Sequence, residues 1–135
     1  MICDRRRGRH AHGSLVFAQN PRLSSTARVF IDSAADAGNS IGLSPISLAE
    51  MLYLTEKNRR PALAYEALTA ALANTMYVIE EVPFNSGVVE AMRQVSRTEI
   101  PDMPDRIVAA TAIFLNVPVI SRDRRIRTSA VKTIW

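Results

Sequence analysis

The stretch Ile100-Pro101-Asp102-Met103-Pro104-Asp105-Arg106 opens one apolar run of the chain, and Ile120-Ser121-Arg122-Asp123 closes the next. Proline in a first helical turn leaves no hydrogen bond unmade, so the first stretch predicts a helix. The continuous apolar segment 117–121 predicts a strand buried in a parallel sheet. Asp105 and Asp123 are eighteen residues apart, which fits a helix plus a short crossover to the sheet edge. Carboxylates that converge there are hard oxygen ligands for Mg²⁺ or Mn²⁺, so this pair indicates metal-dependent phosphate chemistry.

Length and composition indicate one globular domain, which we take as residues 1–135. The single Cys3 excludes an internal disulfide, and the lack of a Cys/His cluster excludes a zinc site of the usual kind. Hydrophobic residues make up 47% of the chain, yet no apolar run reaches the roughly 20 residues that cross a bilayer. The region behind the basic N-terminus is too short for a signal peptide. We therefore expect a cytoplasmic protein that neither spans a membrane nor is exported.

The net charge is +4, from 17 Lys and Arg against 13 Asp and Glu. Two clusters concentrate the excess: Arg5, Arg6, Arg7 and Arg9 near one end, and Arg122, Arg124, Arg125 and Arg127 near the other. Either cluster alone is as well explained by a solvated basic surface. The second cluster flanks Asp123, however, and a basic surface beside an acidic pocket suits RNA or DNA.

Hydrophobic periodicity and turn residues predict alternating helices and strands. The expected helices run from a cap at Ser24 or Ser25 to before Gly38, from Pro45 to before Asn58, from Leu63 to Leu72, from a cap at Asn85 or Ser86 to Val95, and from Pro104 to Leu115. The expected strands are 1–3, 40–44, 76–79, 117–121 and 131–134. This alternation predicts an α/β fold, a three-layer α/β/α sandwich around a mainly parallel sheet.

Such folds place functional groups at the carboxyl ends of strands or in the next helical turns. Asp123 comes just past a predicted strand, and Asp105 lies in the first turn of a helix. Glu50 lies one turn into the helix that follows the strand 40–44, and Asp4 follows the possible first strand. All four acids therefore have a route to the same sheet edge.

Three segments carry a family resemblance: Leu43-Ser44-Pro45-Ile46-Ser47-Leu48-Ala49-Glu50, the run from Pro101 to Ala112, and Val119-Ile120-Ser121-Arg122-Asp123-Arg124-Arg125-Ile126. They look like the successive motifs of PIN-domain nucleases and are most similar to the VapC toxins of bacterial toxin–antitoxin pairs. The resemblance covers about Pro21 to Trp135. It supports the PIN-like sandwich as the fold.

The resemblance implies a Mg²⁺- or Mn²⁺-dependent endoribonuclease. The metal-binding positions of the family match Glu50, Asp105 and Asp123, and the hydroxyl before the last acid matches Ser121, which would orient a metal-bound water or bond Asp123. The resemblance also implies an RNA substrate, a cognate antitoxin that silences the enzyme, and a homodimer. Apolar faces of the predicted helices 24–37 and 63–72 offer a dimer surface, although core packing explains most of them.

The N-terminus departs from the family pattern, in which a hydrophobic strand runs into Asp-Thr or Asp-Ser. Asp4 is followed by Arg5, and the Arg-rich segment 5–13 does not predict an apolar helix. Either Asp4 is the first metal ligand with a divergent loop behind it, or residues 1–20 reflect a shifted reading frame or wrong start. The second explanation predicts a weakened or inactive nuclease. The competing functions are a catalytically impaired PIN-fold module that binds RNA or an antitoxin and, third, a structure-specific DNA nuclease.

Each site residue also has an ordinary structural explanation. Glu50 suits an exposed helix position, Asp105 suits the helix dipole, and Asp123 suits a cap. Asp102 is better explained as a turn or N-cap residue than as a primary ligand. Arg106 is expected to pair with Glu50 or Asp102 and hold the pocket in shape. The metal hypothesis rests on the three acids together, each tied to a predicted strand.

Overall fold

The computed structural model describes residues 2–6, 24–74 and 79–135, with the backbone alone for 2–6. Within these residues five strands form one sheet in the order β3-β2-β1-β4-β5. The strands are β1 (Ile2–Arg6), β2 (Asn39–Leu43), β3 (Ile79–Glu81), β4 (Val119–Ile120) and β5 (Thr133–Ile134). β2 is parallel to β3 and β4 is parallel to β5, whereas β1 runs antiparallel to both β2 and β4. Four strands therefore share one direction, and the sheet is mainly parallel, as predicted.

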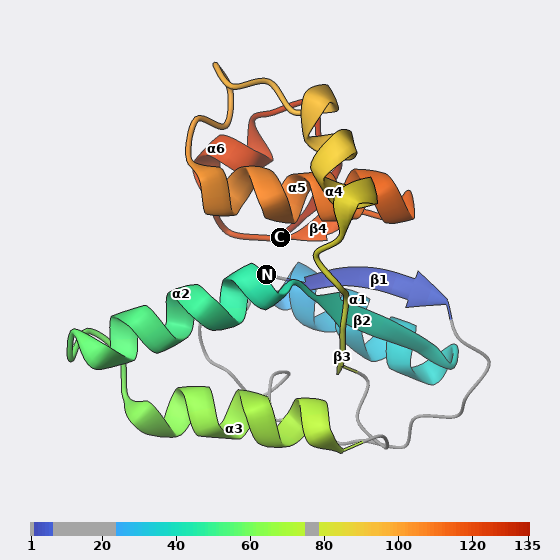
Figure 1. The fold of residues 1–135 in the computed structure, drawn as a ribbon. Helices are drawn as coiled ribbons and strands as arrows, with labels where there is room; N and C mark the ends of the chain where they lie inside the picture. Colours follow the sequence, from blue (N-terminus) through green and yellow to red (C-terminus); the bar gives the residue numbers. More distant parts are fainter. Residues whose placement is uncertain (1, 7–23, 75–78) are drawn as a thin grey trace.

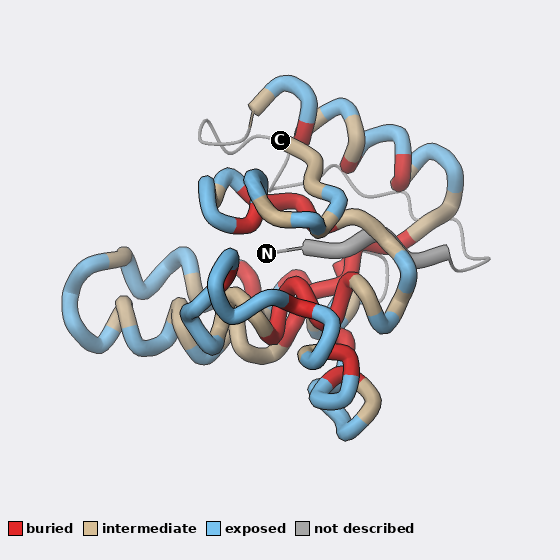
Figure 2. Tube along the Cα trace, turned by 90° about the horizontal axis from the view of Figure 1, so that it is seen from above, coloured by how far each residue is buried: buried red, intermediate tan, exposed pale blue. Residues whose placement is uncertain are grey.

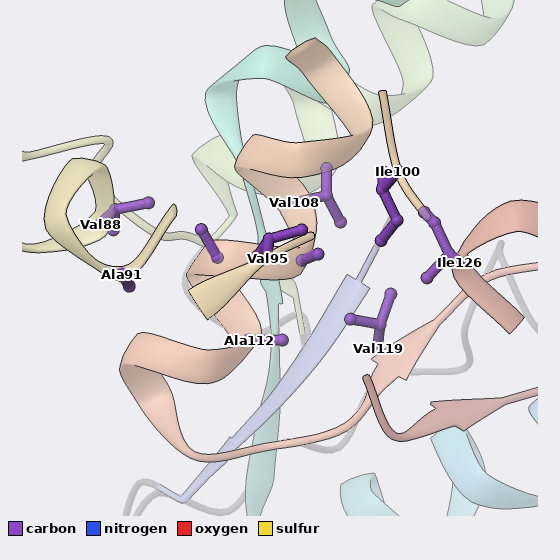
Figure 3. Packing of buried hydrophobic residues seen from close by; sticks show 10 residues of the cluster. Val88, Ala91, Val95, Ile100, Val108, Ala112, Val119 and Ile126 are labelled. Carbon is purple, nitrogen blue, oxygen red and sulfur yellow. The ribbon is translucent and has the colours of Figure 1, made fainter. Parts of the chain in front are cut away.

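Helices cover both faces of the sheet (Figure 1). On one side lie α4 (Ser86–Ala91), the 3₁₀ helix η1 (Met92–Gln94) and α5 (Met103–Leu115), and on the other lie α1 (Ser25–Asp36) and α3 (Ala62–Ala73). Each layer has its own core cluster, and neighbouring strand residues divide between them: Val119 joins the α4–α5 cluster, and Ile120 joins the α1–α3 cluster. Figure 3 shows Val119 packed with Ile126 and Val108 in the first cluster. The three-layer α/β/α fold is confirmed.

Helix α2 (Pro45–Glu56) lies beside this sandwich, in contact with α3 and α5. No residue of α2 is buried, in contrast with α5, where six consecutive residues from Ile107 to Ala112 are. Figure 2 shows the molecule coloured by burial, with red concentrated in the sheet and the helices that cover it. A short helix follows β4, namely α6 (Arg124–Arg127). Within the described residues, no helix has both the length and the apolar character needed to cross a bilayer.

The helix boundaries follow the local signals in the sequence. The Ser24 hydroxyl accepts a hydrogen bond from the backbone N–H of Ala27 at 3.1 Å, and the Asn85 side chain caps α4 in the same way. Gly38, with φ of 74°, follows the end of α1, and Asn116, with φ of 53°, ends α5 in the left-handed conformation. The predicted helices are therefore confirmed, with boundaries within a few residues.

The strands agree less closely. β4 and β5 are each two residues long, shorter than the predicted 117–121 and 131–134, and Pro118 has no N–H to extend the β4 ladder. The predicted strand 76–79 overlaps β3 only at Ile79, since residues 76–78 lie outside the described residues. Short strands give weak periodic signals, so their ends were the least predictable boundaries.

The first strand is the clearest correction. It was expected to end before Asp4, but β1 continues through Arg6, and Asp4 pairs with Ile41 inside the antiparallel ladder. Ile2 pairs with Leu43 and Ile120, the last residues of β2 and β4, so position 4 is two residues inside the carboxyl edge of those strands. The prediction failed because strand direction depends on pairing, which the local sequence does not reveal.

Candidate active site

Three segments meet at the carboxyl edge of β2 and β4. Ser44 follows β2 and caps α2, which carries Glu50 in its second turn. Ser121 follows β4 and leads to Asp123, the N-cap of α6. Asp105 lies in the first turn of α5, and α5 packs against α2 and β4. In Figure 1 α6 is drawn just above the beginning of α5, and α2 begins below them beside the N label.

The acids of this edge influence one another electrostatically. Burial raises the pKa of Glu50, and the neighbouring charges of Asp105 and Asp102 raise it further. Burial also raises the pKa of Asp105, with additional contributions from Asp123 and Asp102, while Arg125 acts in the opposite direction. Asp105 is therefore linked electrostatically to Glu50 on one side and to Asp123 on the other.

Ser121 and Asp123 form a compact turn. The hydroxyl of Ser121, which is 4% exposed, accepts a hydrogen bond from the backbone N–H of Asp123 at 3.0 Å. The Asp123 oxygen Oδ1 accepts from the backbone N–H groups of Arg125 at 2.8 Å and Ile126 at 3.3 Å. The ordinary capping explanation for Asp123 is thus confirmed. Because both bonds use Oδ1, capping is compatible with a role for the second carboxylate oxygen in the site.

Glu50 carries an unsatisfied polar atom. Its oxygen Oε1 is buried and has no hydrogen-bond partner among the described residues. Buried carboxylate oxygens normally have a hydrogen-bond donor or a cation beside them. The raised pKa of the same group has the same origin, since removal from water disfavours its charged form. Glu50 is therefore placed where a proton or a cation would relieve an unfavourable charge.

The donor chemistry fits a divalent cation such as Mg²⁺, because Glu50, Asp105 and Asp123 supply hard carboxylate oxygens and one of these is orphaned. The spacing of those donors, however, does not yet form a metal site. In the stretches 24–74 and 79–135, no three acidic, His or Cys side chains lie close enough together to hold a metal ion as they stand. Asp4 is outside that comparison, since the structure describes only its backbone.

Arg106 was expected to pair with Glu50 or Asp102, but among the described residues its hydrogen bonds go to backbone carbonyls instead. Its Nη2 donates to the backbone carbonyls of Met92 at 2.9 Å and Val95 at 3.3 Å. The Met92 carbonyl also accepts from the backbone N–H of Val95 at 3.1 Å, so Arg106 adds a second, charge-assisted hydrogen bond at the end of η1. Arg106 therefore fastens the first turn of α5, which contains Asp105, to the end of η1.

Asp102 has an electrostatic role at the site that the sequence analysis did not predict. It occupies the N-cap position of α5, as predicted, but makes no capping hydrogen bond with its side chain. It instead contributes to the raised pKa of both Glu50 and Asp105. Its position three residues before Asp105 was a signal for this proximity, because N-cap and first-turn residues lie on the same end of a helix.

The predicted nucleic-acid-binding arginines lie around the last acid. Arg122, Arg124, Arg125 and Arg127 are all exposed. Arg125 lowers the pKa of Asp105 and is therefore within electrostatic reach of the acids. This arrangement places positive charge at the rim of an acidic centre, where a phosphate chain would be attracted.

Two cavities lie elsewhere. One of about 480 Å³ is found at the far end of α5, lined by Asn116, Pro118 and Lys132 among others, and one of about 440 Å³ lies beside it, next to Phe114. Neither is lined by any of the acids described above. The candidate site is thus an open edge of the sheet and not one of these cavities.

The family model described as PIN domain matches residues 15–132, and the chain belongs to the PIN domain family. PIN domains are generally nucleases and typically use divalent metal ions. Comparison with curated proteins and with solved structures finds no match. The family match begins after Asp4, which lies outside the matched residues.

Proposed function

We propose that this PIN domain is a Mg²⁺- or Mn²⁺-dependent endoribonuclease and the VapC-like toxin of a toxin–antitoxin pair, acting in the cytoplasm. The observation that carries the proposal is the placement of Glu50, Asp105 and Asp123 on the segments that follow β2, open α5 and follow β4, where the buried Glu50 oxygen Oε1 has no hydrogen-bond partner among the described residues. Acidic clusters that disfavour their own charge are typical of cation sites in enzymes that act on phosphates.

In this proposal Glu50, Asp105 and Asp123 hold the cation. Asp4 is a fourth ligand if residues 1–20 are the true N-terminus. A cation held there supplies an activated water and offsets charge on the phosphate oxygens. Ser121 keeps the Asp123 backbone in place through its buried hydroxyl. Arg106 acts at a distance from the reaction, because it fixes the turn that presents Asp105.

The exposed arginines Arg122, Arg124, Arg125 and Arg127 would bind phosphates of the RNA. Binding through arginines makes affinity fall as salt is added, since bound counterions are released from the RNA. Replacing Arg124 and Arg127 with Gln should therefore weaken the salt dependence of RNA binding. An unchanged salt slope would count against this role.

The proposal includes two protein partners, a cognate antitoxin and a second copy of the chain. Exposed apolar side chains on both helices of the predicted dimer surface support the second: Val29 on α1 is 63% exposed and Leu63 on α3 is 74% exposed. Large apolar side chains on a surface favour burial in an interface. Analytical ultracentrifugation of the chain and of Leu63→Glu measures this directly.

Cleavage of RNA tests the enzyme proposal. The chain should cut RNA with Mg²⁺ or Mn²⁺ and not with EDTA, and Asp105→Asn should lower the rate by about 100-fold or more, the scale for removing one preorganised electrostatic group. Asp32→Asn is the matched control, an exposed acid on α1 far along the chain from the site. Equal cleavage by Asp105→Asn and the unaltered chain would refute the proposed site.

A catalytically impaired module that binds RNA or an antitoxin is the second candidate. Two observations favour it: the described side chains include no ready three-ligand group, and the family match begins after Asp4. This candidate predicts RNA binding that responds to the arginine substitutions, with no cleavage at any concentration of Mg²⁺ or Mn²⁺. The same assay therefore separates the two functions.

A further inference from the structure

Helix α2 continues beyond Glu50 and carries two more groups on the same side. Tyr53 and Lys57 follow Glu50 by three and seven residues, and this spacing places all three along one stripe of a helix. With a rise of about 1.5 Å per residue, Tyr53 is about 4.5 Å and Lys57 about 10 Å further along the axis. The stripe leads away from the acids toward the turn between α2 and α3 (Figure 1).

Tyr53 is an exposed aromatic residue that core packing does not explain. It is 55% exposed, on a helix without a buried residue. The ammonium nitrogen Nζ of Lys57 lies 4.5 Å from the centre of its ring, a cation–π contact that holds the two side chains together. The contact orients the ring while leaving much of its surface open.

The end of this stripe is basic. Lys57 and Arg59 are exposed and Arg60 is half-buried, all within the turn that joins α2 to α3. Asn58, with φ of 55°, reverses the chain there and brings these residues together. Glu56, the nearest acid, lies on a different side of α2 because it is six residues from Glu50. The stripe therefore combines an open aromatic ring with positive charge.

We propose that Tyr53 and Lys57 form a binding site for a nucleotide of single-stranded RNA that flanks the cleaved phosphate. The base stacks on Tyr53, and Lys57 with Arg59 binds the adjoining phosphates. Aromatic rings beside positive charge are how proteins hold single strands without reading sequence. The 10 Å from Glu50 to Lys57 is room for about three nucleotides at about 3.4 Å each when stacked. The RNA would then run from the α6 arginines, across the acids, and along α2.

This inference rests on the proposed function, but binding tests it without cleavage. The chain carrying Asp105→Asn binds a labelled short single-stranded RNA in EDTA, and fluorescence anisotropy gives the affinity. Adding Tyr53→Ala should weaken binding about tenfold, whereas Tyr53→Phe should stay within about twofold because the ring is kept. Adding Lys57→Gln should make the slope of log affinity against log salt shallower by about 0.7.

An abasic strand with the same phosphates isolates stacking from charge. Tyr53→Ala should leave its binding unchanged, while Lys57→Gln should weaken it. The matched controls are Phe114→Ala, a ring that is 48% exposed at the far end of α5, and Lys132→Gln, an exposed lysine at β5. Both should bind RNA as the parent does, and thermal melting should show that every variant is folded.

The outcomes separate this inference from the enzyme proposal. If Tyr53→Ala binds RNA as tightly as its parent while the unaltered chain cleaves RNA, the stacking site is refuted and the nuclease stands. If the unaltered chain fails to cleave but Tyr53→Ala still weakens binding, the stacking site stands and the nuclease is refuted. Equal losses with Phe114→Ala and Tyr53→Ala would also refute the assignment, because they would show a general effect of removing surface rings.

Discussion

Helices α5 and α2 each present one acid to the site, Asp105 and Glu50, but they are held in the molecule differently. α5 buries six consecutive residues among the sheet and its neighbouring helices, and it is fastened to η1 by Arg106. α2 buries none and lies at the side of the sandwich. The acidic edge therefore joins a part built on the core to a part built on the surface. Substitutions on α5 should change stability, and substitutions on α2 should change ligand binding.

The largest difference should appear between two aliphatic truncations. Ile107→Ala on α5, at a side chain that is 4% exposed, should lower the free energy of unfolding by about 2–5 kcal/mol. Leu52→Ala on α2, 39% exposed, should lower it by less than about 1 kcal/mol. Urea denaturation measures both. Similar losses of unfolding free energy in the two variants would contradict this difference and show that α2 is as much part of the core as α5.

Arg106 tests whether α5 is fixed by more than apolar contact. Arg106→Met keeps much of the side-chain length but removes both hydrogen bonds to the carbonyls of Met92 and Val95, which should lower the free energy of unfolding by about 2 kcal/mol. The control is Arg93→Gln, which removes an exposed ion pair with Glu90 and should change stability by less than about 0.5 kcal/mol. A stability as high as that of the unaltered chain would show that the two carbonyls are satisfied equally well without Arg106.

Asp123 lies on neither α2 nor α5. Its structural role as the cap of α6 can be separated from the role of its charge by two substitutions. Asp123→Ala removes the cap of α6 and should lower the free energy of unfolding by about 1 kcal/mol. Asp123→Asn keeps a good capping side chain, so its stability should stay near that of the unaltered chain while cleavage of RNA is lost. Thermal unfolding and the cleavage assay, run on both variants, check the division. Full cleavage by Asp123→Asn would assign the residue to the cap alone.

The smallest effect concerns pH and treats the two helices alike. The pKa values of Glu50 and Asp105 are raised in the fold, chiefly by burial, so the folded chain binds these protons more tightly than the unfolded chain. Stability is therefore lost as pH rises above their ordinary values of 4.5 and 3.8 toward the raised ones. The stability of Glu50→Gln and of Asp105→Asn should rise relative to that of the unaltered chain as pH increases across that range. The difference should persist at neutral pH.

Melting temperatures of the three proteins, measured from acid to neutral pH, check this prediction. Asp32→Asn is the control, since its carboxylate lies exposed on α1. A difference between the variants and the unaltered chain that does not change with pH would contradict it. A gain for Asp105→Asn alone would sharpen the comparison, because it would confine the electrostatic penalty to the helix that is built on the core.

The helices of this protein were predictable because their signals are local. Ser24 and Asn85 cap helices through bonds to residues three positions ahead, and Asn116 ends α5 by its own backbone conformation. The acids were predictable as candidates because each follows a strand or opens a helix. The hydrogen bonds of Arg106 were not predictable, since its partners lie eleven and fourteen residues away and are brought to it by tertiary packing.

Caps, turns and apolar periodicity act over a few residues, so the helices, most of the strands and the order in which the acids follow them are encoded locally. Long-range packing sets the direction of β1, the place of Asp4 within its ladder, and the electrostatic proximity of Glu50, Asp105 and Asp102. These depend on which distant segments pack together. The free energy of that packing comes from burying apolar surface across the whole chain, and no short stretch of residues encodes it alone.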